Sequence, residues 1–330
     1  MWLRLALANW ANWANCAIGA LLVVLAGCGS VPVSGPVSGP VSTPSKPEVT
    51  GSSTSATVAV APATSITALP LPAKKPLSIG LALGSGAARG FAHVGVIQVL
   101  EEAGIKPSLV VGTSAGSLVA ALYASGKSGN QLQQLAESME EATFADWTLP
   151  IFNRGILRGD ALARYVSTQV GGKAIEDLPL PLGIVATDLN NGQGVLFRRG
   201  DTATAVRASS AVPAVFHPVR ISGRDYVDGG LVSPVPVQFA RQMGAELVLA
   251  VDISTPPEGN SASDTLQILM QTFTIMGRSI NQWEVKDADL LIKPVLVGVG
   301  SADFGARRRA IQAGRLAMQQ AMPQLRALMK

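Results

Sequence analysis

Cysteine and histidine are scarce in this chain of 330 residues, which contains two of each. No cluster of histidine, cysteine and acidic residues has the spacing of a metal site, so we expect neither a metal nor another cofactor. Aromatic residues make up 5% and charged residues 15% of the chain, whereas 48% of the residues are hydrophobic. This composition excludes a chain that is disordered throughout, and the length suits one large α/β domain with appendages.

The first 27 residues have the pattern of an export signal, with Arg4 ahead of an apolar run that is too short to cross a bilayer comfortably. The run ends in "LAGC" (25–28), which resembles the lipobox of bacterial lipoproteins, where the cysteine is acylated and becomes the new N-terminus. Cleavage would remove Cys16 and lipidation would consume Cys28, which leaves no thiol for a disulfide, a nucleophile or a zinc site. An uncleaved anchor, or a signal cut elsewhere, is the alternative.

The segment after the lipobox has the composition of a flexible tether. Residues 30–76 are dominated by Ser, Pro, Thr, Val, Ala and Gly, with almost no charge and no aromatic residue. We therefore assign residues 28–76 to the lipidated cysteine and a linker, and residues 77–330 to one globular domain. The domain would work close to a lipid surface in a bacterial cell envelope. Gly29 is compatible with outer-membrane sorting, facing the periplasm, in a Gram-negative cell.

The formal net charge is +4, and the surplus is concentrated near the C-terminus. Residues 303–330 hold six basic residues against one acidic residue: Arg307, Arg308, Arg309, Arg315, Arg326 and Lys330 against Asp303. A modestly basic helix more often forms a solvated face than a nucleic-acid site, so we expect no nucleic-acid partner. Contact with anionic lipid headgroups is the functional alternative.

Beyond residue 76, short apolar runs alternate with segments of helical spacing, which predicts a parallel and largely buried sheet. Strands are expected at 77–84, 108–112, 182–189, 194–198, 245–254 and 289–296, and a hairpin at 219–230 that turns at Ser222 and Gly223. Helices are expected at 91–103, 115–126, 130–141, 160–170, 202–211 and 265–280, and at the C-terminus. A loop that contains Trp147, Pro150, Phe152 and Asn153 is a candidate lid.

One short motif offers a nucleophile. Gly112, Thr113, Ser114, Ala115 and Gly116 match G-x-S-x-G, in which small neighbours permit a strained strand-to-helix turn that exposes the serine hydroxyl. The free N–H groups and the dipole at the start of the following helix favour negative charge on oxygen. Ser114 is therefore a candidate nucleophile, and a helix N-cap is the plainer interpretation.

The base that would activate this serine is harder to find. Hydrolases of the α/β class order their triad as serine, acid and histidine, but no histidine follows Asp228. A triad would need His217 in an unusual order, in a position more typical of a packed loop histidine. A carboxylate in apolar surroundings has a raised pKa and can act as the base itself. Asp228 suits this role because it ends a short strand before Gly229 and Gly230, although an ordinary Asp-Gly turn explains the same sequence.

A glycine-rich loop follows the first strand and consists of Gly84, Ser85, Gly86, Ala87, Ala88, Arg89 and Gly90. Exposed N–H groups in this loop would form the oxyanion hole that acyl transfer requires. In dinucleotide-binding proteins a glycine-rich loop also lies between a strand and a helix, but that site needs an acidic residue at the end of the second strand. The second strand ends in "GTSAG" instead, which disfavours a nucleotide site.

Five segments taken together resemble the patatin-like phospholipase family, particularly its bacterial members. They are "GLALGSGAARGFAHVGVIQVLEEAGI", "VVGTSAGSLVAALYASG", "ATDLNNGQGVLF", "RASSAVPAVFHPV" and "DYVDGGLVSPVPV", in the family's order over roughly residues 77–300. The resemblance implies a three-layer α/β/α fold with a mainly parallel central sheet. It also implies a Ser-Asp dyad at Ser114 and Asp228 and an oxyanion loop at residues 84–90, without the histidine of ordinary lipases.

The loop departs from the family pattern at one position. The family usually has glycine where this chain has Ala87, and Ser85 is a milder variant. An alanine would be strained if the backbone there needs a positive φ. Arg89 matches the loop's basic residue, which would steady the loop or meet a phosphate, and His93 fits as a helix residue packed behind the loop.

These observations favour a serine acyl-ester hydrolase of the phospholipase A or lysophospholipase type, acting on membrane lipids through an acyl-enzyme intermediate. Its substrate would be a phospholipid or lysophospholipid, and the lipid anchor would hold it at the membrane surface. Two alternatives stay open. One is a non-catalytic envelope lipoprotein that binds lipid or protein, and the other is a Ser-His-Asp esterase that uses His217.

Overall fold

A computed structural model describes residues 77–139, 155–256 and 263–330 of the chain. The predicted signal peptide, the predicted lipidation site Cys28 and the predicted linker lie outside the described residues, and so do the candidate lid residues 147–153. Those assignments remain predictions. Among the described helices, none has both the length and the apolar character required to cross a membrane.

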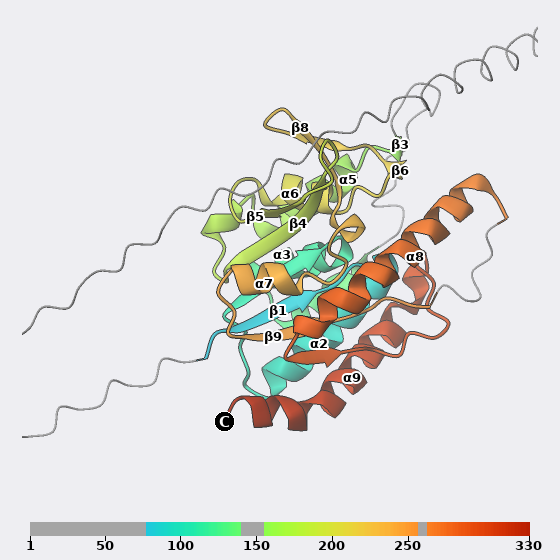
Figure 1. Ribbon diagram of the computed structural model, residues 1–330. Coiled ribbons are helices and arrows are strands. Elements are labelled where there is room, and N and C mark those ends of the chain that lie inside the picture. Colours follow the sequence, from blue (N-terminus) through green and yellow to red (C-terminus); the bar gives the residue numbers. More distant parts are fainter. Residues whose placement is uncertain (1–76, 140–154, 257–262) are drawn as a thin grey trace, which may run out of the picture. The chain divides into compact units, whose positions relative to one another are not determined.

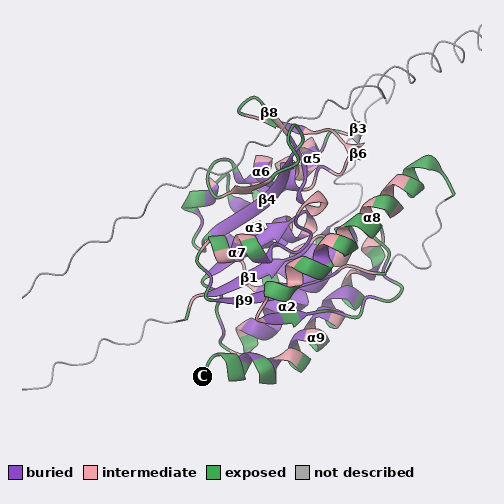
Figure 2. Cartoon of the chain, in the orientation of Figure 1, coloured by how far each residue is buried: buried purple, intermediate pink, exposed green. Residues whose placement is uncertain are grey.

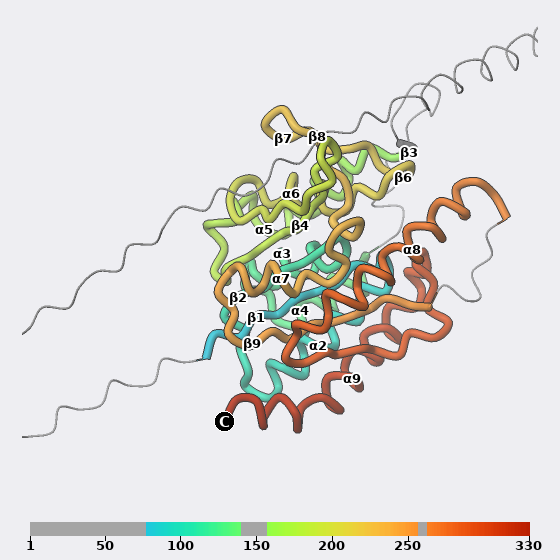
Figure 3. Tube along the Cα trace, viewed as in Figure 1, coloured from blue at the N-terminus to red at the C-terminus, as the bar shows by residue number. Residues whose placement is uncertain are grey.

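A sheet of eight strands lies at the centre of the described domain (Figure 1). The order of the main path is β10, β9, β1, β2, β4, β8 and β7, and β5 pairs with β4. The first five strands of this path run parallel, whereas β5, β7 and β8 are antiparallel to their neighbours. The bounds are β1 Ile79–Leu83, β2 Leu109–Thr113, β4 Leu182–Asp188, β5 Gly194–Phe197, β7 Val219–Ile221, β8 Arg224–Asp228, β9 Leu247–Val251 and β10 Leu290–Ile292. Figure 3 shows β9, from late in the chain, lying beside β1.

Helices cover both faces of this sheet and complete three α/β/α layers. On one face, Leu81 and Leu83 of β1 share a buried cluster with residues of most helices; on the other, Ala82 packs in a cluster with Val237 and Ala240. The first face carries α2 Phe91–Glu102, α3 Ala115–Ala124, α4 Gly129–Ser138, α5 Asp160–Val170, α6 Thr202–Ser209 and α9 Arg307–Leu328. The second carries α7 Val237–Gln242 and, beyond it, α8 Thr265–Glu284 (Figure 1). The predicted fold class is confirmed.

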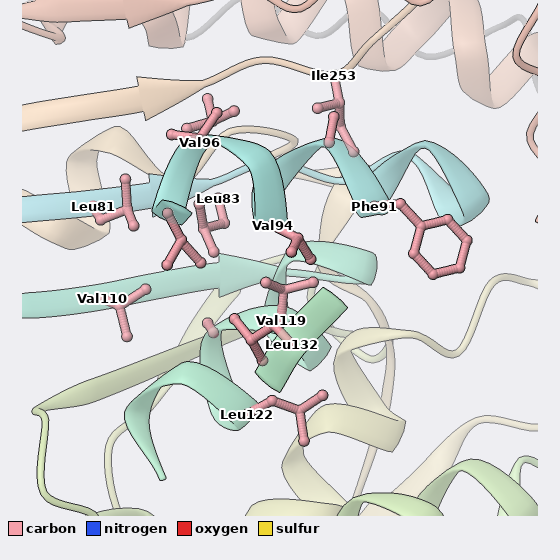
Figure 4. Packing of buried hydrophobic residues seen from close by; sticks show 14 of the residues in the cluster. Leu81, Leu83, Phe91, Val94, Val96, Val110, Val119, Leu122, Leu132 and Ile253 are labelled. Carbon is pink, nitrogen blue, oxygen red and sulfur yellow. The ribbon is translucent and has the colours of Figure 1, made fainter. Parts of the chain in front are cut away.

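Side-chain size alternates along β1, and the larger side chains face the larger of the two cores. In β1 the side chains of Leu81 and Leu83 belong to one buried cluster with Val94 of α2 and Val119 of α3, which Figure 4 shows from close by. The intervening positions hold Gly80 and Ala82, against which α7 packs closely. Strands buried on both faces read as continuous apolar runs, which is why the sequence predicted them without any polar alternation.

The structure agrees with most predicted elements and adds some that were missed. The hairpin at 219–230 turns at Ser222 and Gly223 as expected, both with positive φ. The helix expected at 265–280 continues to Glu284. Missed elements are α7 and a small sheet in which β3 Gly155–Leu157 pairs with β6 Ala214–Phe216. These elements have three to six residues each, too short for a periodic pattern.

The basic C-terminal helix uses much of its charge within the protein. Arg307 donates to the carbonyl groups of Ala136, Glu137 and Met139 and so caps the end of α4. Three further arginines form ion pairs: Arg308 with Glu137 at 3.1 Å, Arg309 with Asp303 at 3.4 Å and Arg315 with Glu102 at 2.8 Å. The predicted alternative, a basic face that meets anionic headgroups, therefore loses four of its six cations to intramolecular contacts.

Two glycines let α2 and α9 approach each other closely. A β-carbon on Gly314 would lie 1.9 Å from the carbonyl oxygen of Ala92, and one on Gly95 would lie 2.0 Å from that of Ile311. Neither distance is possible without moving a helix, because both obstacles are backbone atoms. The glycines therefore fix the distance between these helices.

We expect Gly314→Ala to lower the free energy of unfolding by about 1–3 kcal/mol, because the helices must separate. The matched control is Gly277→Ala in α8, where a β-carbon would meet nothing closer than 3.8 Å. That change should raise stability by up to about 1 kcal/mol, since alanine favours the helix. Urea denaturation of both variants checks the contrast, and equal effects would contradict it.

Candidate active site

Ser114 lies on a sharp turn between β2 and α3. Its backbone has φ 53° and ψ −120°, a conformation that L-residues seldom adopt. The hydroxyl donates a hydrogen bond of 2.6 Å to Oδ2 of Asp228. Both side chains are buried, with exposed fractions of 8% and 6%. The structure therefore brings together the two residues that the family resemblance singled out.

Strand register explains how residues 114 positions apart meet. β2 pairs with β4, and β4 pairs with β8 so that Ala186 lies opposite Asp228. The carboxyl end of β2 and the end of β8 are thus held one strand apart. Thr187 adds a bond of 2.8 Å from its hydroxyl to the carbonyl oxygen of Asp228.

The turn at Ser114 depends on its two flanking glycines. A β-carbon on Gly112 would lie 2.3 Å from the carbonyl oxygen of Gly116, and one on Gly116 would lie 2.1 Å from that of Leu83. Thr113 is buried and donates from its hydroxyl to the carbonyl oxygen of Ser233 at 2.9 Å. Larger residues at the two glycine positions would displace the hydroxyl of Ser114.

Burial raises the pKa of Asp228 to about 6, and hydrogen bonds oppose that rise only in part. Oδ2 accepts the hydroxyl of Ser114, and Oδ1 accepts the amide of Gly230 at 2.7 Å. The amide belongs to the short 3-10 helix η4, Gly229–Leu231, which begins directly after the carboxylate. A carboxylate with this pKa is ionised at neutral pH and is a stronger base than an exposed aspartate.

The glycine-rich loop is fastened to neighbouring segments at several points. The amide of Gly84 donates to Val251 at 3.1 Å, that of Ser85 to Pro234 at 2.8 Å and that of Ala88 to Ser301 at 3.0 Å. Within the described chain, the amides of Gly86 and Ala87 are paired with no acceptor. The loop continues into the 3-10 helix η1, Ala87–Gly90, which meets Ala115 at the start of α3.

Ala87 has φ 51°, so the alanine that stands where the family usually has glycine does adopt a positive φ. A non-glycine residue in this region carries strain, and glycine would relieve it. Arg89 in the same loop donates from Nη1 to the hydroxyl of Thr255 at 2.5 Å, and burial lowers its pKa. Its contact is one that steadies the loop.

Neither histidine contacts the hydroxyl of Ser114 by a hydrogen bond. His93 is fully buried and donates from Nε2 to the carbonyl oxygen of Gly84 at 2.8 Å, behind the loop as expected. Burial lowers the pKa of His93 to about 4, so the ring stays neutral. His217 follows β6, and its backbone amide donates to Leu157 at 3.0 Å.

One positioning residue was missed in the sequence. Ser209, near the end of α6, accepts the backbone amide of Ser114 at 2.8 Å and donates to the carbonyl oxygen of Val185 at 2.5 Å. It thereby ties the strained turn to β4. The segment "RASSAVPAVF" contributed to the resemblance, but nothing local indicates that one of its serines reaches a turn 95 residues away.

An apolar pocket of about 200 Å³ opens beside Ser114. One face of α3 lines it for two turns, from Ser114 through Leu118 to Leu122, a distance of about 12 Å. The other walls come from η1, α2, α4, α5, the segment after α6 and the residues just before α9. They include Ala87, Phe91, Val94, Leu132, Leu135, Met139, Leu162, Val212, Phe216 and Phe304. Almost every lining side chain is apolar, so the pocket suits a hydrocarbon chain.

Across residues 77–139, 155–256 and 263–330, no three His, Cys, Asp or Glu side chains are grouped so that they could hold a metal ion. The described site combines a buried hydroxyl, a carboxylate of raised pKa and two unpaired amides beside an apolar pocket.

Residues 81–241 match the family described as patatin-like phospholipase. An uncharacterized NTE family protein of Mycobacterium tuberculosis is 37% identical over 202 residues, which cover 61% of this chain and 56% of that protein. The human patatin-like phospholipase domain-containing protein 6 is 32% identical over 217 residues, or 63% of this chain and 16% of that protein. The chain thus spans less than two thirds of the length of these relatives.

The fold has a counterpart among solved structures. VipD from Legionella pneumophila superimposes with a TM-score of 0.51 at 16% identity, over 76% of this chain and 67% of that chain. The shared fold and the sequence match over residues 81–241 agree with the motifs around Ser114 and Asp228. Over residues 81–241 the chain is thus similar to the patatin-like phospholipase family.

Proposed function

We propose that this protein is a serine acyl-ester hydrolase of the phospholipase A or lysophospholipase type. The observation that carries the proposal is the 2.6 Å hydrogen bond from Ser114 to a buried Asp228, at one end of an apolar pocket. The hydroxyl has a base, and the pocket has room for an acyl chain. The family that residues 81–241 match supports the same substrate class.

In the first half of the reaction, Oδ2 of Asp228 accepts the proton of Ser114 while Oγ bonds to the carbonyl carbon of the ester. The carbonyl electron pair moves to oxygen, and the amides of Gly86 and Ala87 donate to the resulting oxyanion. The bond to the leaving alcohol then breaks, and the alcohol takes the proton from Asp228. The acyl group remains on Ser114 as an ester.

In the second half, water replaces the alcohol. Asp228 accepts a proton from the water as its oxygen attacks the acyl carbon, and the fatty acid leaves as Ser114 regains the proton. The carboxylate acts as base and then as acid in each half, so no imidazole is needed.

The predicted lipoprotein N-terminus completes this proposal. Acylation of Cys28 would hold the domain at a bacterial envelope membrane, and the linker over residues 28–76 would let it reach lipid substrates. A phospholipid or lysophospholipid is the substrate, with one acyl chain in the pocket.

One observation favours a second function. The positive φ of Ala87 strains the loop that would hold the oxyanion, as expected if the loop no longer serves catalysis. The protein would then be an envelope lipoprotein that binds lipid in the same pocket without hydrolysing it.

Ser114→Ala and Asp228→Asn should each lower kcat/KM for an acyl ester by at least about a thousandfold, because nucleophile and base act as a unit. Hydrolysis of a chromogenic ester and labelling with a fluorophosphonate measure the two effects. His217→Ala should keep full activity, since its side chain is not the partner of Ser114. Wild-type protein that neither hydrolyses esters nor takes the label would favour the lipid-binding function.

Activity should require ionised Asp228, whose pKa burial raises to about 6. We therefore expect kcat/KM to fall tenfold per pH unit below about pH 6 and to level off above it. A water-soluble ester in buffers of constant ionic strength serves for the measurement. Burial also raises the pKa of Glu284 to about 7, so Glu284→Gln is the control and should retain the midpoint. A midpoint near pH 4, the ordinary value for aspartate, would contradict the prediction.

The length of the pocket should limit the length of the acyl chain that the enzyme accepts. Leu122→Trp fills the pocket two turns from Ser114 and Leu118→Trp one turn from it, so the second variant should lose activity at a shorter chain length. Both should keep activity on acetyl esters. The profile of kcat/KM over esters of increasing chain length measures this, with Tyr123→Trp on the same helix as the control. An identical profile in both pocket variants would mean that the chain binds elsewhere.

A further inference from the structure

α8 presents an unusual face to solvent. Within its 20 residues only Asn281 is buried, and Figure 2 shows the helix in pink and green beside the purple central strands. We name the outward strip by six exposed residues at helical spacing: Ile268, Thr272, Ile275, Met276, Ser279 and Trp283. The four large apolar side chains among them are each at least 51% exposed.

The two hydroxyl groups of the outward strip do little to make it polar. Thr272 donates to the carbonyl oxygen of Ile268 at 2.9 Å, and Ser279 donates to that of Ile275 at 3.2 Å. Both donors are thus used within the helix. Residues 265–283 contain no carboxylate, and their single charge is the cation Arg278. The strip is therefore apolar along its length and carries no negative charge.

The opposite face of α8 packs on the segment that follows Asp228. A β-carbon on Gly277 would lie 3.8 Å from Pro234 and 3.9 Å from the carbonyl oxygen of Gly230. Glu284 accepts hydrogen bonds from the hydroxyl of Ser233 and, at 3.2 Å, from the amide of Val235. In the same segment, the amide of Gly230 donates to the carboxylate of Asp228, and the carbonyl oxygen of Pro234 accepts the amide of Ser85 in the oxyanion loop. The outward strip is therefore held in a fixed place relative to the catalytic groups.

We propose that the outward strip of α8 docks on the surface of a phospholipid bilayer and holds the segment of Asp228 at that surface. The occupant follows from charge and from the side chains at the C-terminal end of the helix. Large apolar residues without a carboxylate among them, next to the cation Lys286, match a bilayer of anionic headgroups.

The end of the helix has the residues of a membrane interface. The Nζ atom of Lys286 lies 3.7 Å from the ring centroid of Trp283, which is 72% exposed. Tryptophan and a neighbouring cation suit the headgroup level, where one end of the side chain is apolar and the other is wet. A helix of this length would lie along the interface for about 30 Å. The basic α9 offers less, because four of its arginines are engaged within the protein.

The role of this docking rests on the proposed function, because it would bring a hydrolase to its lipid substrate. Membrane binding itself can be tested without measuring hydrolysis. The two cysteines are Cys16 and Cys28, so replacing both by serine leaves a full chain without thiols. In this background, with Ser114→Ala added, Met276→Cys carries an environment-sensitive fluorophore on α8. Leu316→Cys places the same probe on α9, where Leu316 is 48% exposed.

With vesicles of phosphatidylcholine and phosphatidylglycerol, the probe at residue 276 should shift to the blue and become shielded from an aqueous quencher. The probe at residue 316 should not change. Protein that stays in solution, an equal response at both positions, or a probe at 276 that is silent on bound protein would overturn the proposal. A probe at 276 that is already shielded without vesicles would also overturn it, because a second copy or residues 1–76 would then cover the strip.

Activity provides the second arm. Ile268→Glu combined with Ile275→Glu should lower hydrolysis of vesicle lipid at least about tenfold, because burial of two isoleucines is lost and repulsion from anionic lipid is gained. Hydrolysis of a short water-soluble ester should stay within about twofold. Leu316→Glu combined with Leu328→Glu on α9 is the matched control and should change neither rate. An equal loss on both substrates would overturn the docking role, and wild-type protein inactive on both would overturn the hydrolase while the fluorescence still decides the docking.

Discussion

The hydrogen bond between Ser114 and Asp228 requires a carboxylate to stay ionised where water hardly reaches it. Burial destabilises the charge and raises the pKa of Asp228 to about 6, while the hydroxyl of Ser114 and the amide of Gly230 compensate in part. A third strong donor would lower the pKa and weaken the base. The site therefore combines a small number of donors with close packing, and the rest of the structure serves to maintain that balance.

The geometry of the site depends on a backbone that is strained at two points. Ser114 and Ala87 both have positive φ, and each such residue costs on the order of 1–3 kcal/mol. Distant segments hold these conformations with hydrogen-bond acceptors. The hydroxyl of Ser209 accepts at the turn, and the carbonyl oxygens of Val251, Pro234 and Ser301 accept from amides of the loop. The buried cluster of the parallel strands supplies the stability that offsets the strain. Loss of one of these hydrogen bonds would therefore affect activity before it affected the fold.

The sequence predicted the parts of this structure that have local patterns. Buried parallel strands appear as apolar runs, and G-x-S-x-G marks Ser114 because Gly112 and Gly116 leave no room for a β-carbon. Asp228 was different: its place at the end of a short strand made it a candidate base, but an ordinary Asp-Gly turn explains the same sequence, and the family resemblance decided between the two interpretations. Its partnership with Ser114 depends on the pairing of β4 with β8, which no local signal encodes. The contacts of Ser209 with the turn, and the packing of α8 on the segment that follows Asp228, were not predicted for the same reason, because they join residues far apart in the sequence.

Two kinds of contact connect α8, which carries the outward strip, to the segment that follows Asp228. Its packed face lies close to the catalytic segment at Gly277, where a β-carbon would be 3.8 Å from Pro234 and 3.9 Å from the carbonyl oxygen of Gly230, and such close packing gives attraction without a preferred orientation. The directional contact comes from Glu284, whose pKa burial raises to about 7 and whose oxygens accept from Ser233 and Val235. A carboxyl that is largely withdrawn from water is costly, and Glu284 offsets this cost with two hydrogen bonds that fix the angle between the helix and the catalytic segment. A helix that only filled space would not need it, whereas a helix that sets the orientation of Asp228 toward a lipid surface does.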